Sequence, residues 1–158
     1  MQERHWLTRL NPLKRLRTGN ILDKSGLVLV IVDVSGSMAA EQLRLVESVL
    51  MTLWRKGATV LAVQADVEVK TKPLLFRGYG TLEKFVGRGG TSFSAALQYA
   101  ETLVPTPDVV VYYTDGYEYG GLSRPPKVPV IWLLTESGES AEAFRRRYPF
   151  GDVVKVTS

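Results

Sequence analysis

Short runs of consecutive apolar residues, rich in β-branched side chains, constrain the fold of this chain more than any other feature. The clearest runs are residues 27–32 (LVLVIV), 108–114 (DVVVYYT) and 128–134 (VPVIWLL). A half-exposed strand alternates apolar and polar residues, whereas a continuous apolar run is typical of a strand buried on both faces. These runs therefore predict parallel strands in the middle of a sheet that helices cover on both sides.

Helical patterns, in which apolar side chains recur every three or four positions, separate these strands. The predicted helices are residues 37–56, 81–86, 92–103 and 139–148. The further predicted strands are residues 58–65, 67–71 and 152–157. Because Pro73 closely follows the segment 67–71, we assign this segment to the sheet edge, antiparallel to its neighbour. The order predicts an α/β fold: a doubly wound, mostly parallel, Rossmann-like sheet with one antiparallel edge strand.

The first 24 residues are predicted to be a basic amphipathic segment, followed by one domain at residues 25–158. Residues 1–20 contain five basic residues and one acidic residue, and 5 − 1 = +4 equals the formal net charge of the whole chain. The absence of cysteine excludes disulfides and thiolate metal sites. No apolar run reaches the roughly 18–20 residues of a membrane span, and no secretory signal pattern is present, which favours a cytoplasmic protein.

Polar residues gather where the predicted strands end and the helices begin. They are Asp33, Ser35, Ser37, Thr91 and Asp115. In an open parallel sheet, ligands bind outside the carboxyl ends of the strands. Two carboxylates and three hydroxyls form an all-oxygen set, which suits a hard cation such as Mg²⁺. Each residue also has a structural alternative, since Asp33 fits a turn, and Ser37 and Thr91 fit helix N-caps.

Three short motifs carry a resemblance to von Willebrand factor type A (VWA) domains. The stretch DVSGSM has the Asp-x-Ser-x-Ser form of that family's metal-ion-dependent adhesion site, GGT ending at Thr91 resembles its second loop, and TDG containing Asp115 resembles its third. The resemblance implies that Ser35, Ser37 and Thr91 are direct or near-direct ligands, and that Asp33 and Asp115 act largely through waters. It implies Mg²⁺, with Mn²⁺ or Ca²⁺ as alternatives, and a partner carboxylate that completes the coordination.

The C-terminal half narrows this resemblance. The segments VYYTDGYEYGG, PPKVPVIWLLT and YPFGDVVKV are similar to bacterial VWA-like domains that are associated with MoxR-type AAA+ ATPases. Too few residues separate Asp115 from Val128 for the crossover helix of the wider family. Two departures concern the partner: the group's leading region is mostly absent, and Ser92 stands where an acidic residue is often found. The resemblance implies a protein-interaction module, with a MoxR-type ATPase as a partner.

Four residues around Asp115 are candidates for a partner surface, since tyrosine is a common interface anchor. They are Tyr113, Tyr117, Glu118 and Tyr119. For Glu118 an approach to the ion is an alternative. The arginines at 145–147 end a predicted helix, where cations suit the helix dipole, and we interpret them as a solvated face.

Two other functions compete with the interaction module. A Mg²⁺-dependent phosphatase-like enzyme would use an Asp-x-Asp pair, but the second position here is Ser35, which cannot act as a carboxylate acid or base. We therefore assign no catalytic residues. A nucleic-acid-binding protein would use the basic N-terminal arm, and its binding would fall steeply with salt. The rest of the chain offers no nucleic-acid motif, so the metal-dependent interaction module is the favoured prediction.

Overall fold

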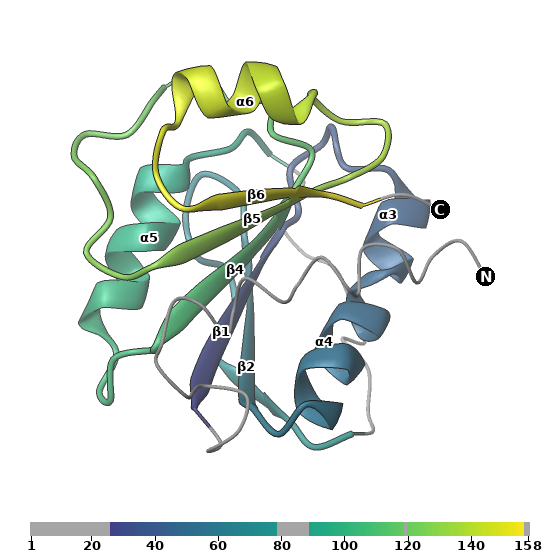
Figure 1. Cartoon of the computed structure of the whole chain (residues 1–158), viewed down its shortest axis with the longest axis vertical. Coiled ribbons are helices and arrows are strands. Elements are labelled where there is room, and N and C mark those ends of the chain that lie inside the picture. The colour runs from purple at the N-terminus through teal and green to yellow at the C-terminus, as the bar shows by residue number, and fades with distance from the viewer. Residues whose placement is uncertain (1–25, 79–88, 119, 157–158) are drawn as a thin grey trace.

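The computed structural model describes residues 26–78, 89–118 and 120–156 (Figure 1). The strands are β1 (Leu27–Asp33), β2 (Thr59–Ala65), β3 (Leu74–Phe76), β4 (Val109–Thr114), β5 (Val130–Leu134) and β6 (Asp152–Lys155). The helices are α3 (Ala40–Arg44), α4 (Val46–Arg55), α5 (Phe93–Thr102) and α6 (Ala141–Arg147). The predicted helix at 81–86 and the N-terminal segment 1–24 lie outside the described residues.

In the described residues, the strands form one six-stranded sheet in the order β3-β2-β1-β4-β5-β6. Neighbouring strands are parallel except for β3, which is antiparallel to β2 at the edge. The central strand β1 pairs with β2 through Leu27–Thr59 and with β4 through Val28–Val109. The predicted fold class, a mostly parallel α/β sheet with one antiparallel edge strand, is therefore confirmed.

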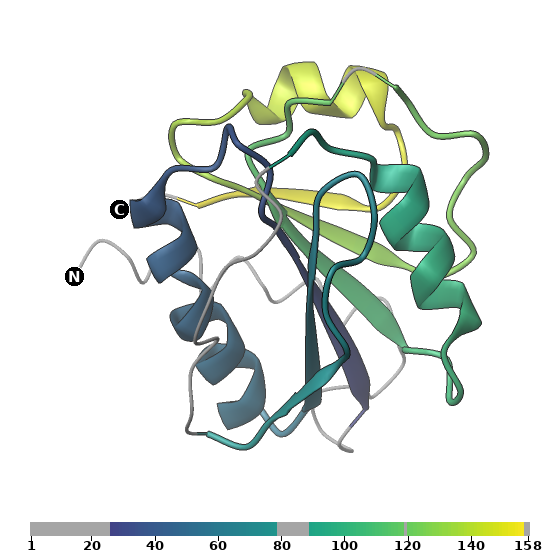
Figure 2. The same ribbon diagram turned by 180° about the vertical axis from the view of Figure 1, so that it is seen from behind.

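Helices cover both faces of the sheet, with α3 and α4 on one side and α5 and α6 on the other (Figures 1 and 2). Successive residues of β1 point to opposite faces, so that Val30 packs with the α3–α4 core and Ile31 packs with the α5–α6 core. Both are fully buried. Burial on both faces explains why the run at 27–32 contains no polar residue.

Two predicted elements differ from the structure. The helix predicted at 37–56 is divided at Leu45, whose N–H bonds to the Gln42 carbonyl three residues back rather than four. The edge strand is β3, after Pro73, and not residues 67–71. Asp66 accepts a hydrogen bond from the Glu68 N–H, so the chain turns sharply after β2. In the segment 67–71, pairing is limited to an isolated bridge between Val69 and Ala65.

No helix connects β4 to β5 in the described residues of that connection, 115–118 and 120–129, as predicted from its length. The connection is instead fastened to α5 by Glu101. Its carboxylate pairs with Arg124 at 2.5 Å and accepts the Lys127 N–H at 2.8 Å. Residues 115–118, which follow β4, belong to no helix or strand and lie near the carboxyl edge of the sheet.

Candidate metal centre

The first loop begins at Asp33, the last residue of β1, which is fully buried. Its Oδ1 accepts the Ser35 N–H at 2.9 Å, and its Oδ2 accepts the hydroxyl of Thr114, the last residue of β4, at 2.5 Å. The carboxylate is therefore oriented by two adjacent parallel strands. The Asp33 carboxylate therefore stabilises the turn, which is the role given above as its structural alternative. It does so beside the serine hydroxyls.

Ser35 and Ser37 bring their hydroxyl oxygens within 3.2 Å of each other. Residues i and i+2 of this tight loop thus point to one side. The N-cap of α3 is Ala39, so Ser37 is not the helix cap. Between the serines, Gly36 donates its N–H to the Gly89 carbonyl at 2.8 Å, which joins the first loop to the second.

The second loop, residues 89–92, is held by Asp66 at the end of β2. The Asp66 carboxylate accepts the Gly89 N–H at 3.2 Å, and its backbone carbonyl accepts the Ser92 N–H at 2.9 Å. Ser92 is the N-cap of α5, since its hydroxyl accepts the Ala95 N–H. The capping role suggested as an alternative for Thr91 is therefore taken by Ser92. Asp66 thus supports this loop through both its side chain and its backbone.

The third loop begins at Asp115, directly after β4. The Asp115 Oδ1 accepts the Tyr117 N–H at 3.1 Å, whereas Oδ2 is buried without a hydrogen-bond partner in the described structure. The backbone carbonyl of Asp115 accepts the Glu139 N–H at 2.8 Å, which holds the residue against the β5–α6 connection. Buried polar atoms are rarely left unpaired, so Oδ2 is the atom of this loop best suited to contact a water or an ion.

The two aspartates make the site electrically unbalanced. Burial raises the pKa of the Asp33 carboxyl, hydrogen bonds from Ser35 and Thr114 oppose this rise, and the nearby charge of Asp115 adds to it. Within the described ranges, no lysine or arginine forms an ion pair with either carboxylate. Nor do three or more acidic or histidine side chains gather anywhere in that part of the chain. The oxygen set is therefore two carboxylates and several hydroxyls, and a divalent cation would balance its charge.

A pocket of about 500 Å³ opens at these loops. It is lined by Ser35, Gly36, Ser37, Gly89, Gly90, Thr91, Tyr117 and Glu118. Hydroxyl-bearing residues of the first two loops thus line one cavity, and the buried Asp33 adjoins it through Ser35. Asp115 adjoins it through Tyr117. The fold brings all three predicted loops to one site.

The predicted partner surface needs correction. Tyr113 is fully buried in the core beside α3, where its hydroxyl donates to the Gln42 carbonyl at 2.7 Å. The side chain of Glu118 is also buried and accepts hydrogen bonds from within the domain. Neither side chain therefore offers the surface that a partner contact would need. Tyr117 is 43% exposed at the pocket, which leaves it as the candidate contact, while Tyr119 lies outside the described residues.

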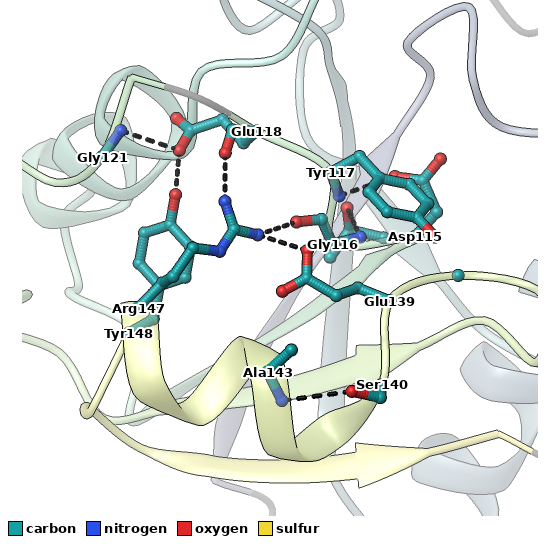
Figure 3. Close-up of polar contacts among 12 residues, drawn as sticks. Asp115, Gly116, Tyr117, Glu118, Gly121, Glu139, Ser140, Ala143, Arg147 and Tyr148 are labelled. Carbon is teal, nitrogen blue, oxygen red and sulfur yellow. Dashed lines mark hydrogen bonds and ion pairs between the residues drawn. The ribbon is translucent and has the colours of Figure 1, made fainter.

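Arg147 has a role that sequence reasoning missed. Its guanidinium donates to the Gly116 carbonyl at 2.8 Å and the Glu118 carbonyl at 2.6 Å, and pairs with Glu139 at 2.5 Å (Figure 3). Arg145 also binds a backbone carbonyl, that of Val153. All three arginines are exposed, in agreement with their interpretation as a solvated face, but Arg145 and Arg147 also bind backbone carbonyls. No local pattern reveals the contacts of Arg147 with the third loop, because they connect a helix end to residues 29 and 31 positions earlier.

The fold and site together define a class of protein: an α/β domain of the von Willebrand factor type A kind, with hydroxyl-bearing loops at the carboxyl edge of its sheet. The chain belongs to the VWA-like domain family DUF2201, whose model matches residues 28–157. No curated protein matches the chain. Among solved structures it is similar to an aerotolerance-related membrane protein from Bacteroides fragilis, carrying multiple mutations to serines. The TM-score is 0.59 and the identity 14%, over 84% of this chain and 92% of that chain.

That likeness concerns the fold alone. In the described part of this chain, no helix is both long and apolar enough to cross a membrane. This chain is a VWA-like domain, and VWA-like domains are generally protein-interaction modules.

Proposed function

We propose that this domain binds an acidic side chain of a partner protein through a divalent cation, preferentially Mg²⁺. Ser35, Ser37 and Thr91 would supply direct oxygen ligands from the pocket wall. Asp33 and Asp115 would orient bound waters and balance the charge. The donor set consists of hard oxygens, which is what Mg²⁺ prefers, with Mn²⁺ or Ca²⁺ as alternatives.

The observation that carries this proposal is the unpaired Oδ2 of Asp115. It is a buried carboxylate oxygen without a hydrogen-bond donor in the described structure, in the loop that continues to the pocket-lining Tyr117. The two serine hydroxyls, 3.2 Å apart, provide a second group of oxygens at the same pocket. Neither group is needed to cap a helix, and both fit the coordination of a cation.

The chemistry of the ligands favours recognition over catalysis. Neutral hydroxyls near the ion leave much of its positive charge unbalanced, so a carboxylate from outside is attracted to an open coordination position. The Asp-x-Asp pair of a phosphatase-like mechanism is absent, because Ser35 occupies the second position. The site therefore suits binding of an aspartate or glutamate presented by another protein.

A MoxR-type AAA+ ATPase is our proposed kind of partner, based on the resemblance of the C-terminal half to domains associated with such ATPases. Co-purification in Mg²⁺ and its loss in EDTA would test this. A cytoplasmic location remains a prediction, which cell fractionation would check.

Thermal unfolding in EDTA and in increasing Mg²⁺ or Mn²⁺ tests the ion site. A ligand that binds only the folded state stabilises it by about 2.7 kcal/mol at a hundredfold excess over Kd. We expect a metal-dependent rise in Tm for the wild type and none for Asp33→Ala or Asp115→Asn. The matched control is Glu142→Gln, which removes one carboxylate from an exposed position on α6. A wild-type Tm that does not respond to millimolar metal would contradict the proposal.

A further inference from the structure

One buried carboxylate connects three separate segments near the pocket. The side chain of Glu118 is only 3% exposed and accepts hydrogen bonds from the Phe93 N–H at 2.9 Å and the Gly121 N–H at 3.1 Å. It also accepts the hydroxyl of Tyr148, the residue that follows α6. Figure 3 shows Glu118 between Gly121 and Tyr148, at the end of α6. Both carboxylate oxygens are thus engaged inside the protein.

These contacts join the second loop to the third. Phe93 is the first residue of α5, two positions after Thr91, while Glu118 lies three positions after Asp115. A carboxylate is also favoured at the N-terminus of a helix, where the backbone N–H groups are unpaired. The Glu118–Phe93 bond therefore fixes the start of α5, and the loop before it, relative to the loop that contains Asp115.

Arg147 fixes the backbone on which Glu118 is carried. It binds the carbonyls of Gly116 and Glu118, on either side of Tyr117, so the third loop is held at two points. Its guanidinium is in turn oriented by Glu139 and lies 5.2 Å from the centre of the Tyr148 ring. Arg147 thus holds the backbone carbonyl of Glu118, while Tyr148 holds its carboxylate.

We infer that Glu118, supported by Arg147 and Tyr148, is a positioning residue that sets the spacing between the Thr91 and Asp115 loops of the ion site. It does not bind the ion, because its oxygens already accept three internal hydrogen bonds. This inference rests on the proposed metal-dependent function. Without the hydrogen bonds of Glu118, binding of the ion would have to order the two loops. Part of the binding free energy would then be lost, so the affinity for the ion would fall. Outer-shell partners of metal ligands typically change affinity by about 10–100-fold.

The test measures the Mn²⁺ dissociation constant and the metal-free Tm of the full chain, separately, for each variant. Glu118→Gln keeps the size of the side chain but replaces one acceptor oxygen with an NH₂ group, so at least one of the three donors loses its acceptor. We expect Mn²⁺ affinity to fall by about tenfold or more. Tyr148→Phe removes only the hydroxyl and keeps the ring packed, and we expect a smaller fall in the same direction.

Ser140→Ala is the matched control for a merely structural effect. The Ser140 hydroxyl caps α6 by accepting the Ala143 N–H at 3.1 Å (Figure 3), and it forms no hydrogen bond with the described residues of the third loop. This variant should lower the metal-free Tm and leave the Mn²⁺ affinity unchanged. If Glu118→Gln and Tyr148→Phe behave in the same way as Ser140→Ala, the positioning role is overturned while the proposed function stands. A wild type that binds no Mn²⁺ overturns both.

Discussion

One carboxylate oxygen of Asp33, Oδ2, accepts a hydrogen bond from the hydroxyl of Thr114. Thr114 donates to Asp33 Oδ2 and also accepts the Gly116 N–H at 3.0 Å, so it connects the first loop to the third from within the core. Thr114 is fully buried. Its side chain is therefore placed to influence both the stability of the fold and the orientation of a metal-site carboxylate.

Replacing Thr114 with the isosteric valine should destabilise the protein by about 1–3 kcal/mol, because a buried carboxylate oxygen and a buried N–H lose their partner. The hydrogen bond from Thr114 lowers the pKa of Asp33, so its loss should raise that pKa further. The control is Thr52→Val, whose hydroxyl bonds the Ser48 carbonyl at an exposed site and should cost at most about 0.5 kcal/mol. Urea unfolding measures the free energy of unfolding of both variants. Equal losses in Thr114→Val and Thr52→Val would contradict the role of Thr114.

Gly138 allows the β5–α6 connection to approach Asp115 closely. A Cβ at Gly138 would collide with the backbone carbonyl of Asp115. We expect Gly138→Ala to destabilise the fold by about 1–3 kcal/mol, as overpacking does, and to weaken the response of Tm to metal, because Asp115 must move. Gly120→Ala is the control, since a Cβ there would make only an ordinary contact, 3.8 Å from Glu118 Oε2. An unchanged metal response in Gly138→Ala would contradict this expectation.

At the scale of elements, an aromatic cluster fastens α5 and α6 to the same face of the sheet. Trp132 of β5 stacks on Tyr112 of β4 at 5.2 Å and contacts Phe144 of α6 at 4.9 Å. The ring centre of Phe93, the first residue of α5, lies 5.0 Å from that of Trp132 and 6.1 Å from that of Phe144. The helix that holds Arg147 and the helix that begins after Thr91 are thus positioned by one packed cluster.

Phe144→Ala should therefore cost about 3–5 kcal/mol, the range for removing a large buried aromatic side chain. Trp54→Ala, on α4, removes a larger side chain that is 41% exposed, and we expect a smaller loss. Chemical denaturation of both variants, without metal, gives the comparison. A Phe144→Ala loss no greater than that of Trp54→Ala would show that the cluster does not anchor α6.

At the scale of the whole molecule, the strands of the described residues lie between 27 and 155, within or beside the matched family region 28–157. We expect deletion of residues 1–24 to leave the metal-free Tm and the metal-induced shift nearly unchanged. The same deletion tests the nucleic-acid alternative, because the basic residues of the N-terminal arm would be lost. Binding of DNA or RNA that falls steeply with salt in the full chain, and disappears on deletion, would support that alternative. Failure of residues 25–158 to fold would contradict the predicted boundary.

Several elements were predictable because their signal is local. The uniform apolar runs at β1, β4 and β5 follow from burial on both faces, and the short β4–β5 connection excludes a crossover helix. The position of β3 was not predictable, since it depends on how Asp66 turns the chain after β2. The burial of Tyr113 was also missed, because it depends on the distance of α3 from β4 and on the Gln42 carbonyl that its hydroxyl reaches.

The sequence by itself determined the fold class and the five oxygen-bearing residues proposed for the ion, because alternating periods and strand-end positions are properties of short segments. Only the tertiary structure decided how the loops are held. The bonds of Glu118 to Phe93 and of Arg147 to Gly116 cross 25 and 31 positions of the chain. Such contacts exist only once the sheet has brought its carboxyl ends together, and no spacing within the sequence encodes them.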